Sequence, residues 1–178
     1  MGTLRRTTSS TGRGTPARML LLSALIVVAD QIAKLIVVNT MRMGHSIDVI
    51  GSVVRLTRTA NTGAAFGLFR GGSTWFVWIS AAASVAIIAF SREIVKMRFW
   101  ERTAFGLVLG GAVGNLVDRI RLGAVVDFLD IGFGTLRWPS FNVADSAITI
   151  GVVILAIHLV FLSDPHQSTP LSPSGENE

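Results

Sequence analysis

Long apolar stretches constrain this chain more than any other feature of its sequence. Residues 19–38 form the first of four such stretches, and about 20 apolar residues are enough for an α-helix to cross a bilayer. Only 15% of the residues are charged and the mean hydropathy is +0.57, whereas a typical soluble domain carries about 25% charged residues. The composition therefore predicts one integral membrane domain.

The pattern between the apolar stretches predicts strands. Apolar and polar residues alternate at 53–59, as in a half-buried strand, and residues 123–132 are also strand-like. We therefore predict an α-helical membrane protein with four transmembrane helices and a small extracytoplasmic β-rich region. The transmembrane helices are expected at residues 19–38, 74–90, 103–118 and 141–162, with extracytoplasmic loops at 39–73 and 119–140.

Both ends of the chain differ from this membrane domain, which is expected to span residues 19–162. Residues 1–18 are polar and basic, and residues 163–178 are rich in Pro and Ser, so we expect two disordered tails. Four basic residues fall within positions 91–102, which places this loop and both termini in the cytoplasm by the positive-inside rule. The net charge of +5 is therefore interpreted as a preference for membrane lipids and not for nucleic acid.

Several ionisable residues interrupt the apolar stretches. Charged groups at membrane depth are costly, so each is a candidate functional residue. Asp30 and Lys34 are spaced for a helical ion pair, which either belongs to a site or extends to the membrane interface without one. Gly106, Gly110 and Gly114 form a stripe of small residues that favours close helix packing.

Asp127 and Asp145 are the candidate catalytic pair. Asp127 lies among apolar residues of a predicted strand. Asp145 follows Asn142 by three positions, so Asn142 and Asp145 share a helical face. Two carboxyl groups in contact share a proton, so one acts as a base and the other as an acid. Structural capping, favoured by the helix dipole, and ion or proton transport remain alternatives for Asp145.

Other catalytic chemistries find little support in the sequence. The chain has no cysteine, no Ser in a G-x-S-x-G pattern and no histidines at metal-ligand spacing. We therefore expect neither a metal nor another cofactor. Asp118 and Arg119 are interpreted as an ion pair or cap at a helix end, and Asp130 as a solvated loop charge.

Four motifs, in order, resemble those of the lipoprotein signal peptidase (signal peptidase II) family of bacterial membrane aspartyl endopeptidases. DQIAK resembles the D-x-x-x-K motif, and NTGAAFGLF resembles the N-x-G-x-A-F motif. GGAVGNLVDRIRLGAVVDF resembles the G-G-x-x-G-N-x-x-D-R-x-x-x-G-x-V-x-D-F motif, and FNVADSAI resembles the F-N-x-A-D motif. The match covers most of residues 19–160.

The resemblance implies cleavage of prolipoprotein signal peptides before a diacylglyceryl-modified cysteine, without a metal. It also implies four transmembrane helices, an extracytoplasmic β-cradle and an extracytoplasmic amphipathic helix in the bacterial cytoplasmic membrane. Asp127 and Asp145 match the catalytic pair. The supporting positions, which match other motif residues or lie within them, are Asp30, Lys34, Asn61, Gly63, Asn115, Asp118, Arg119 and Asn142.

Two other functional classes fit the composition. A small transporter or proton channel would also need intramembrane carboxylates, but would arrange them along a continuous polar path. A non-catalytic scaffold would account for the glycine stripe and not for the carboxylates. We expect a monomer without an obligate protein partner.

Overall fold

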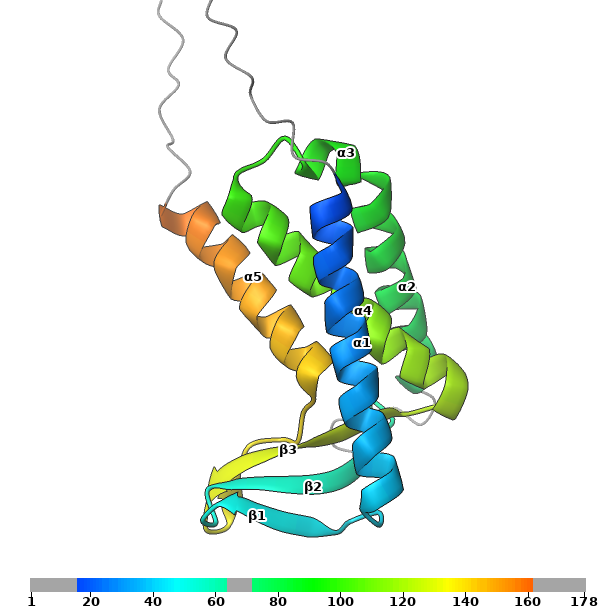
Figure 1. Cartoon of the computed structure of the whole chain (residues 1–178), viewed down its shortest axis with the longest axis vertical. Helices are drawn as coiled ribbons and strands as arrows, with labels where there is room; N and C mark the ends of the chain where they lie inside the picture. Colours follow the sequence, from blue (N-terminus) through cyan, green and yellow to red (C-terminus); the bar gives the residue numbers. More distant parts are fainter. Residues whose placement is uncertain (1–15, 64–71, 162–178) are drawn as a thin grey trace, which may run out of the picture.

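The computed structural model describes residues 16–63 and 72–161 and shows a bundle of long helices with a sheet at one end (Figure 1). The sheet lies at the end of the bundle where α1 finishes and α5 begins. The elements in chain order are α1 (Pro16–Thr40), β1 (Ser46–Ile50), β2 (Val54–Asn61), α2 (Gly72–Ala89), α3 (Ser91–Ile94), α4 (Phe99–Leu122), β3 (Val125–Phe133), β4 (Leu136–Arg137) and α5 (Val143–Phe161).

Within its apolar stretch, helix α1 buries its charged residues and exposes large apolar ones. On α1, Leu21 and Leu35 are about 60% exposed (61% and 60%), whereas Asp30 and Lys34 are buried. This is the reverse of a soluble helix, whose apolar stripe faces the core. This arrangement is expected in a lipid bilayer, because apolar side chains are favourably exposed to lipid whereas charged side chains are costly there and lie between helices.

Length and hydropathy single out α1 and α5 as helices able to cross a membrane, each with a mean hydropathy of 2.2. The apolar part of α2, Thr74–Ala89, is shorter. α4 has 24 residues but carries acidic and basic groups in its first and last turns. The predicted crossing by all four helices therefore stays a prediction.

The helix limits correct parts of the sequence-based expectation. α1 begins at Pro16, so residues 16–18 are helical and not disordered; proline is well suited to a first helical turn. α4 extends four residues beyond each end of the predicted 103–118. α5 begins at Val143, so Asp145 lies in its first turn rather than one turn inside the helix.

Glycines bring α4 close to its neighbours, as the small-residue stripe predicts. A Cβ at Gly110 would lie 2.7 Å from Ile26 Cβ and 2.8 Å from the Ser23 carbonyl oxygen of α1. The Ser23 hydroxyl also donates a 2.9 Å hydrogen bond to the Gly106 carbonyl. α4 therefore packs backbone against backbone on α1, which fixes the position of the polar residues between them.

Substituting Gly110 by Ala is expected to destabilise the bundle by about 1–3 kcal/mol, because a buried methyl group has no room there. Thermal unfolding of the purified protein in detergent measures the effect. Ala86→Val adds methyl groups at an exposed position of α2 and serves as the control. Equal unfolding temperatures for Gly110→Ala and Ala86→Val would contradict the close packing.

The four strands form one antiparallel sheet in the order β1-β2-β3-β4, which confirms the β-rich region. β2 pairs with β3 so that Thr59 faces Asp127 and Asn61 faces Val125. The described segments 41–63 and 123–142 contain no helix that could be the expected extracytoplasmic amphipathic helix. Residues 64–69 of the NTGAAFGLF motif lie outside the described residues.

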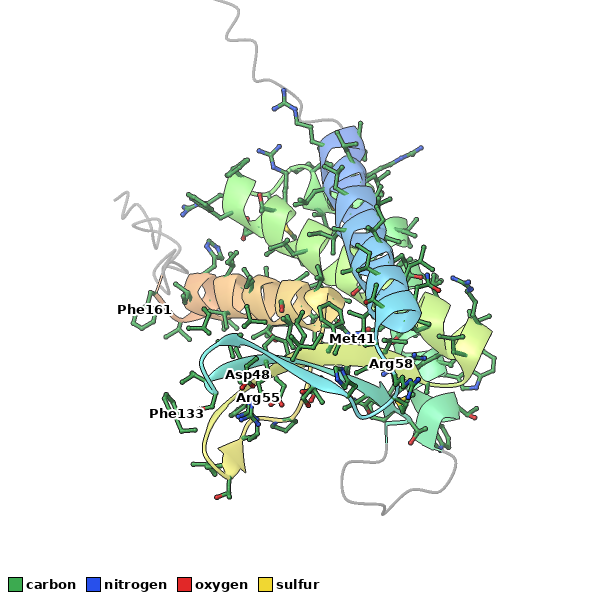
Figure 2. The ribbon with its side chains drawn as sticks, turned by 60° about the horizontal axis from the view of Figure 1, so that its bottom comes forward. Met41, Asp48, Arg55, Arg58, Phe133 and Phe161 are labelled. Atoms are coloured by element: carbon green, nitrogen blue, oxygen red, sulfur yellow. The ribbon has the colours of Figure 1, made fainter. Side chains whose placement is uncertain are left out.

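Arg58 ties the sheet to the end of α1 (Figure 2). Its Nη1 donates to the carbonyl oxygens of Val38 at 3.0 Å and Met41 at 2.7 Å. These bonds satisfy carbonyl groups that have no partner within the helix. Beneath them, Val37 and Met41 pack against Val126 and Phe128 of β3. β3 is thereby held against the base of the bundle.

Candidate active site

Asp127 lies on β3 and is 1% exposed. Asn61 Nδ2 of the neighbouring strand donates to its Oδ2 at 3.0 Å. Asn142 Nδ2, just before α5, donates to its Oδ1 at 2.7 Å. Both carboxylate oxygens therefore have an amide donor, and the side chain is held at the junction of sheet and bundle.

Asp145 approaches the same junction from the first turn of α5. Its Oδ2 accepts the Asn142 backbone N–H at 3.2 Å, while its own N–H donates to Asn142 Oδ1 at 2.9 Å. This reciprocal arrangement is a capping box, and it fixes the start of the helix. Its other oxygen, Oδ1, accepts a 2.7 Å hydrogen bond from Asn115 Nδ2 of α4.

Asn142 connects the two carboxylates. Its Nδ2 reaches both Asp127 Oδ1 and Asn115 Oδ1, the latter at 3.2 Å, and it is fully buried. The structure thus brings Asp127 of β3 and Asp145 of α5 to one site. Asp145 therefore caps the start of α5 and also lies in the same site as Asp127, so the capping role does not exclude a role in the carboxylate pair.

A buried charge cluster supports this site from α1 and α4. Lys34 Nζ lies 2.7 Å from Asp30 Oδ2, 2.8 Å from Asp118 Oδ2 and 3.1 Å from Asn115 Oδ1. The Lys34 and Asp30 side chains are 4% and 0% exposed. The alternative that this pair extends to the membrane interface is therefore wrong.

Asp118 also differs from its expected role as a partner of Arg119. It pairs with Lys34 and accepts the Val126 backbone N–H at 3.1 Å. Arg119 instead lies over the Phe76 ring of α2, with its guanidinium carbon 5.2 Å from the ring centre. Its Nε is buried without a hydrogen-bond partner in the described part of the chain.

A pocket of about 590 Å³ opens beside Asp127. Asn61, Gly63, Phe76 and Arg119 line it. Gly63 has φ +79, and a Cβ there would lie 2.5 Å from the Phe76 ring, so both the backbone conformation and the close approach of this ring favour glycine at this position.

A second pocket of about 430 Å³ reaches Asp145. Trp138, Phe141 and Ile150 give it a mainly apolar wall. The carboxylate pair is therefore accessible from two cavities, one beside each aspartate.

Comparison with known proteins gives the family. A profile described as signal peptidase (SPase) II matches residues 22–161. The chain belongs to the signal peptidase II family. The matched range contains every residue of the carboxylate pair and of the buried charge cluster.

Several relatives of this signal peptidase II family member are similar over most of their length. The lipoprotein signal peptidase of Desulforapulum autotrophicum is 41% identical over 155 residues, which cover 83% of this chain and 94% of the relative. That of Nostoc punctiforme is 44% identical over 128 residues, covering 72% and 80%. A bacterial membrane enzyme solved by the in meso method at 2.3 Å resolution is 34% identical, with a TM-score of 0.74 over 85% of this chain and 94% of its own.

Signal peptidase II membership makes this chain an aspartic-type endopeptidase of a membrane enzyme family. The enzyme class predicted from the sequence is thereby confirmed, and membership disfavours the transporter and scaffold alternatives. Among residues 16–63 and 72–161, no group of three or more His, Asp or Glu side chains is placed to hold a metal ion.

Sequence reasoning missed one polar residue of this signal peptidase II site. Gln31 Nε2 donates to Asp118 Oδ1 at 2.9 Å, to Asp30 Oδ2 at 3.2 Å and to the Gly114 carbonyl at 3.3 Å. It therefore satisfies Asp118 Oδ1 and the Gly114 carbonyl oxygen, and it shares Asp30 Oδ2 with Lys34. Its position next to Asp30, as a polar residue within an apolar stretch, could have identified it as a candidate site residue.

The environment of Asp127 favours its protonated form. Burial is the main cause that raises the pKa of Asp127, to about 6, and the negative charge of Asp145 raises it further. Hydrogen bonds from Asn61 and Asn142 act in the opposite direction, because they stabilise the carboxylate. An acid and a base can thus coexist in the pair near neutral pH.

Proposed function

We propose that this family member removes signal peptides from prolipoproteins by cleaving before the diacylglyceryl-modified cysteine, with Asp127 and Asp145 activating a water molecule. The observation that carries the proposal is that Asn142 contacts both carboxylates: its side-chain Nδ2 donates to Asp127 and its backbone N–H donates to Asp145. Relatives named lipoprotein signal peptidase support the substrate class.

The reaction follows from one shared proton. The ionised aspartate takes a proton from water as the water oxygen attacks the scissile carbonyl carbon. The protonated aspartate donates to the carbonyl oxygen, which gives a tetrahedral intermediate. The protonated aspartate then donates to the departing amine nitrogen, and the ionised one takes a proton from a hydroxyl of the intermediate. The C–N bond breaks, the carbonyl re-forms and the pair again holds one proton. Burial strengthens each of these electrostatic contacts.

The pockets supply positions for the substrate. Arg119 lines the cavity beside Asp127, so its guanidinium group is placed to hold a carbonyl or phosphate oxygen of the lipidated peptide. Asn61 fixes Asp127, and its Oδ1 accepts the Gly63 N–H at 2.8 Å. The loop after β2 therefore begins at the catalytic carboxylate.

The proposed setting is the bacterial cytoplasmic membrane, crossed four times with both termini in the cytoplasm. The inverted polarity of α1 and the density of basic residues around α3 support this arrangement. The sheet would then lie at the outer surface. A lipid-anchored substrate helix could reach the pockets laterally from the bilayer. We further propose that the chain acts as a monomer.

Cleavage should require the lipid on the substrate. We expect the purified protein in detergent to cleave a diacylglyceryl-modified prolipoprotein and to leave the same polypeptide intact when its cysteine carries no lipid. Mass spectrometry of the products identifies the bond that is cut. Equal cleavage of both substrates would contradict the proposed specificity, and no cleavage of either would contradict the function.

The pH profile should report the shared proton. Because burial raises the pKa of Asp127 to about 6, raising the pH above that value takes the proton from Asp127 and removes the acid. We expect kcat/KM to fall by about tenfold per pH unit on this side. Asn61→Leu removes a hydrogen bond that stabilises the carboxylate, so the midpoint should move to higher pH.

The midpoint, and not the absolute rate, is the quantity to compare. Asn39→Leu alters an exposed asparagine and should leave the midpoint unchanged. A midpoint that moves to lower pH in Asn61→Leu would contradict the assigned effect of this hydrogen bond.

A further inference from the structure

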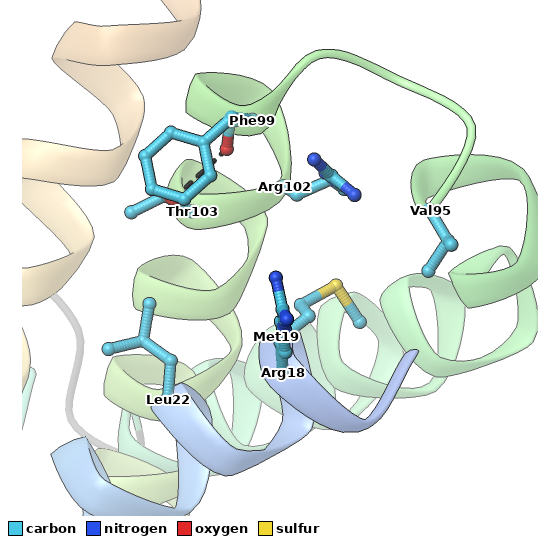
Figure 3. A pocket seen from close by; sticks show the side chains of 7 residues that line it. All are labelled: Arg18, Met19, Leu22, Val95, Phe99, Arg102 and Thr103. Atoms are coloured by element: carbon cyan, nitrogen blue, oxygen red, sulfur yellow. Dashed lines mark hydrogen bonds between the residues drawn. The ribbon is translucent and has the colours of Figure 1, made fainter. Parts of the chain in front are cut away.

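A pocket of about 310 Å³ lies at the other end of the bundle, where α1 and α4 begin (Figure 3). It is distinct from the candidate active site. Arg18 at its rim and Lys34 in the charge cluster are on the same helix, and their spacing corresponds to about 24 Å along the axis. The pocket therefore has its own chemistry.

Two arginines converge on this pocket. Arg18 comes from α1 and Arg102 from α4, and Figure 3 shows both guanidinium groups directed toward the space between the helices. Neither forms an ion pair within residues 16–63 and 72–161. The nearby acidic side chains are already paired, Glu93 with Lys96 and Glu101 with His158.

The positions of the two arginines are unfavourable without an anion. Each lies in the first or second turn of its helix, where the positive end of the helix dipole disfavours a cation. Two like charges that face one pocket also repel each other. A bound anion would remove both costs and would gain the bidentate hydrogen bonds that guanidinium groups form with phosphate.

The remaining wall of the pocket is apolar. Met19 and Leu22 of α1 and Phe99 of α4 line it together with Val95. Met19 is buried, whereas Phe99 is 61% exposed and extends the apolar surface outward. A small soluble anion would gain no binding energy from this apolar wall, but the glycerol and first acyl carbons of a phospholipid would contact it favourably.

We propose that this pocket binds an anionic phospholipid. Its phosphate would lie between Arg18 and Arg102, and its glycerol and proximal acyl chain against Met19, Leu22 and Phe99. Such a lipid would link the starts of α1 and α4 in the membrane leaflet opposite the sheet. The proposal depends on the membrane location of the family and not on the cleavage reaction.

Native mass spectrometry of the full chain in detergent tests the proposal, with phosphatidylglycerol and phosphatidylcholine as probes. We expect one phosphatidylglycerol to bind at least about tenfold more tightly than phosphatidylcholine, which corresponds to about 1.4 kcal/mol. Arg18→Gln combined with Arg102→Gln should abolish this preference. Arg18→Lys combined with Arg102→Lys should retain part of it, because the charge remains while the bidentate geometry is lost.

Arg92→Gln combined with Lys96→Gln is the matched control. It removes the same net charge from the same end of the bundle, at exposed positions that do not line the pocket. The proposal predicts that this control keeps the lipid preference. It is overturned if both double Gln variants lose the preference equally, if neither loses it, or if millimolar inorganic phosphate displaces the lipid. Thermal unfolding of each variant in detergent verifies the fold.

Discussion

Asp127→Asn and Asp145→Asn should each lower kcat/KM for prolipoprotein cleavage by between about a hundredfold and ten-thousandfold, the usual contribution of a general acid or base. Asparagine has nearly the same shape as aspartate and still accepts a hydrogen bond from Asn142 or Asn115. It cannot take a proton from water. The fold should therefore persist while the reaction is lost, which cleavage kinetics and thermal unfolding together measure.

Asp48→Asn is the matched control for these substitutions. Asp48 is on β1 of the same sheet, but its carboxylate is 61% exposed and lies 2.8 Å from Arg55 Nε of β2 (Figure 2). Its activity should remain at the wild-type level. Substantial cleavage by a folded Asp127→Asn or Asp145→Asn variant would move the catalytic role to another residue, with Asp118 the next candidate.

Lys34→Met should be the most destabilising single substitution in the bundle. It leaves the carboxylates of Asp30 and Asp118 buried without a cation, and breaking a buried ion pair in this way costs about 3–5 kcal/mol. Thermal unfolding in detergent should show a large fall in stability. Cleavage should fall as well, because Asn115 loses the lysine that orients its amide oxygen.

Removing the charges of Lys34, Asp30 and Asp118 together distinguishes the cost of unpaired buried carboxylates from the cost of lost side-chain packing. Lys34→Met combined with Asp30→Asn and Asp118→Asn leaves no buried charge unpaired, so it should be more stable than Lys34→Met alone. Lys96→Met removes the cation of an exposed pair with Glu93 and should change stability little. A triple variant less stable than Lys34→Met would contradict the charge argument.

The sequence predicts the elements of this fold better than their limits. Apolar length identifies the helices, and alternation identifies the strands, because both patterns are local. α4 continues beyond the predicted transmembrane span for a reason that is not local in the sequence. Asp118 and Arg119 resemble a helix end in the sequence, whereas in the structure Lys34 of another helix neutralises Asp118 and the helix continues to Leu122.

Asp130 shows the same limit in the sheet. The sequence indicates a solvated loop charge, but Asp130 is buried, with its carboxylate 2.6 Å from Arg137 Nε and 3.0 Å from the Thr57 hydroxyl. Strand register places these partners beside it, and register depends on pairing between distant segments. The same pairing brings Asn61 to Asp127, which spacing alone could not show.

The amide of Asn115 has a consequence for how the site responds to change. Its oxygen faces the Lys34 ammonium and its nitrogen faces the Asp145 carboxylate, so the lysine polarises the group and strengthens the hydrogen bond on the far side. The positive charge of Lys34 on α1 thereby affects the Asp145 carboxylate through the Asn115 amide. Substitutions at Lys34 and Asp145 should therefore be non-additive in a double-mutant cycle, and the acidity of the reaction centre should be adjustable from a neighbouring helix.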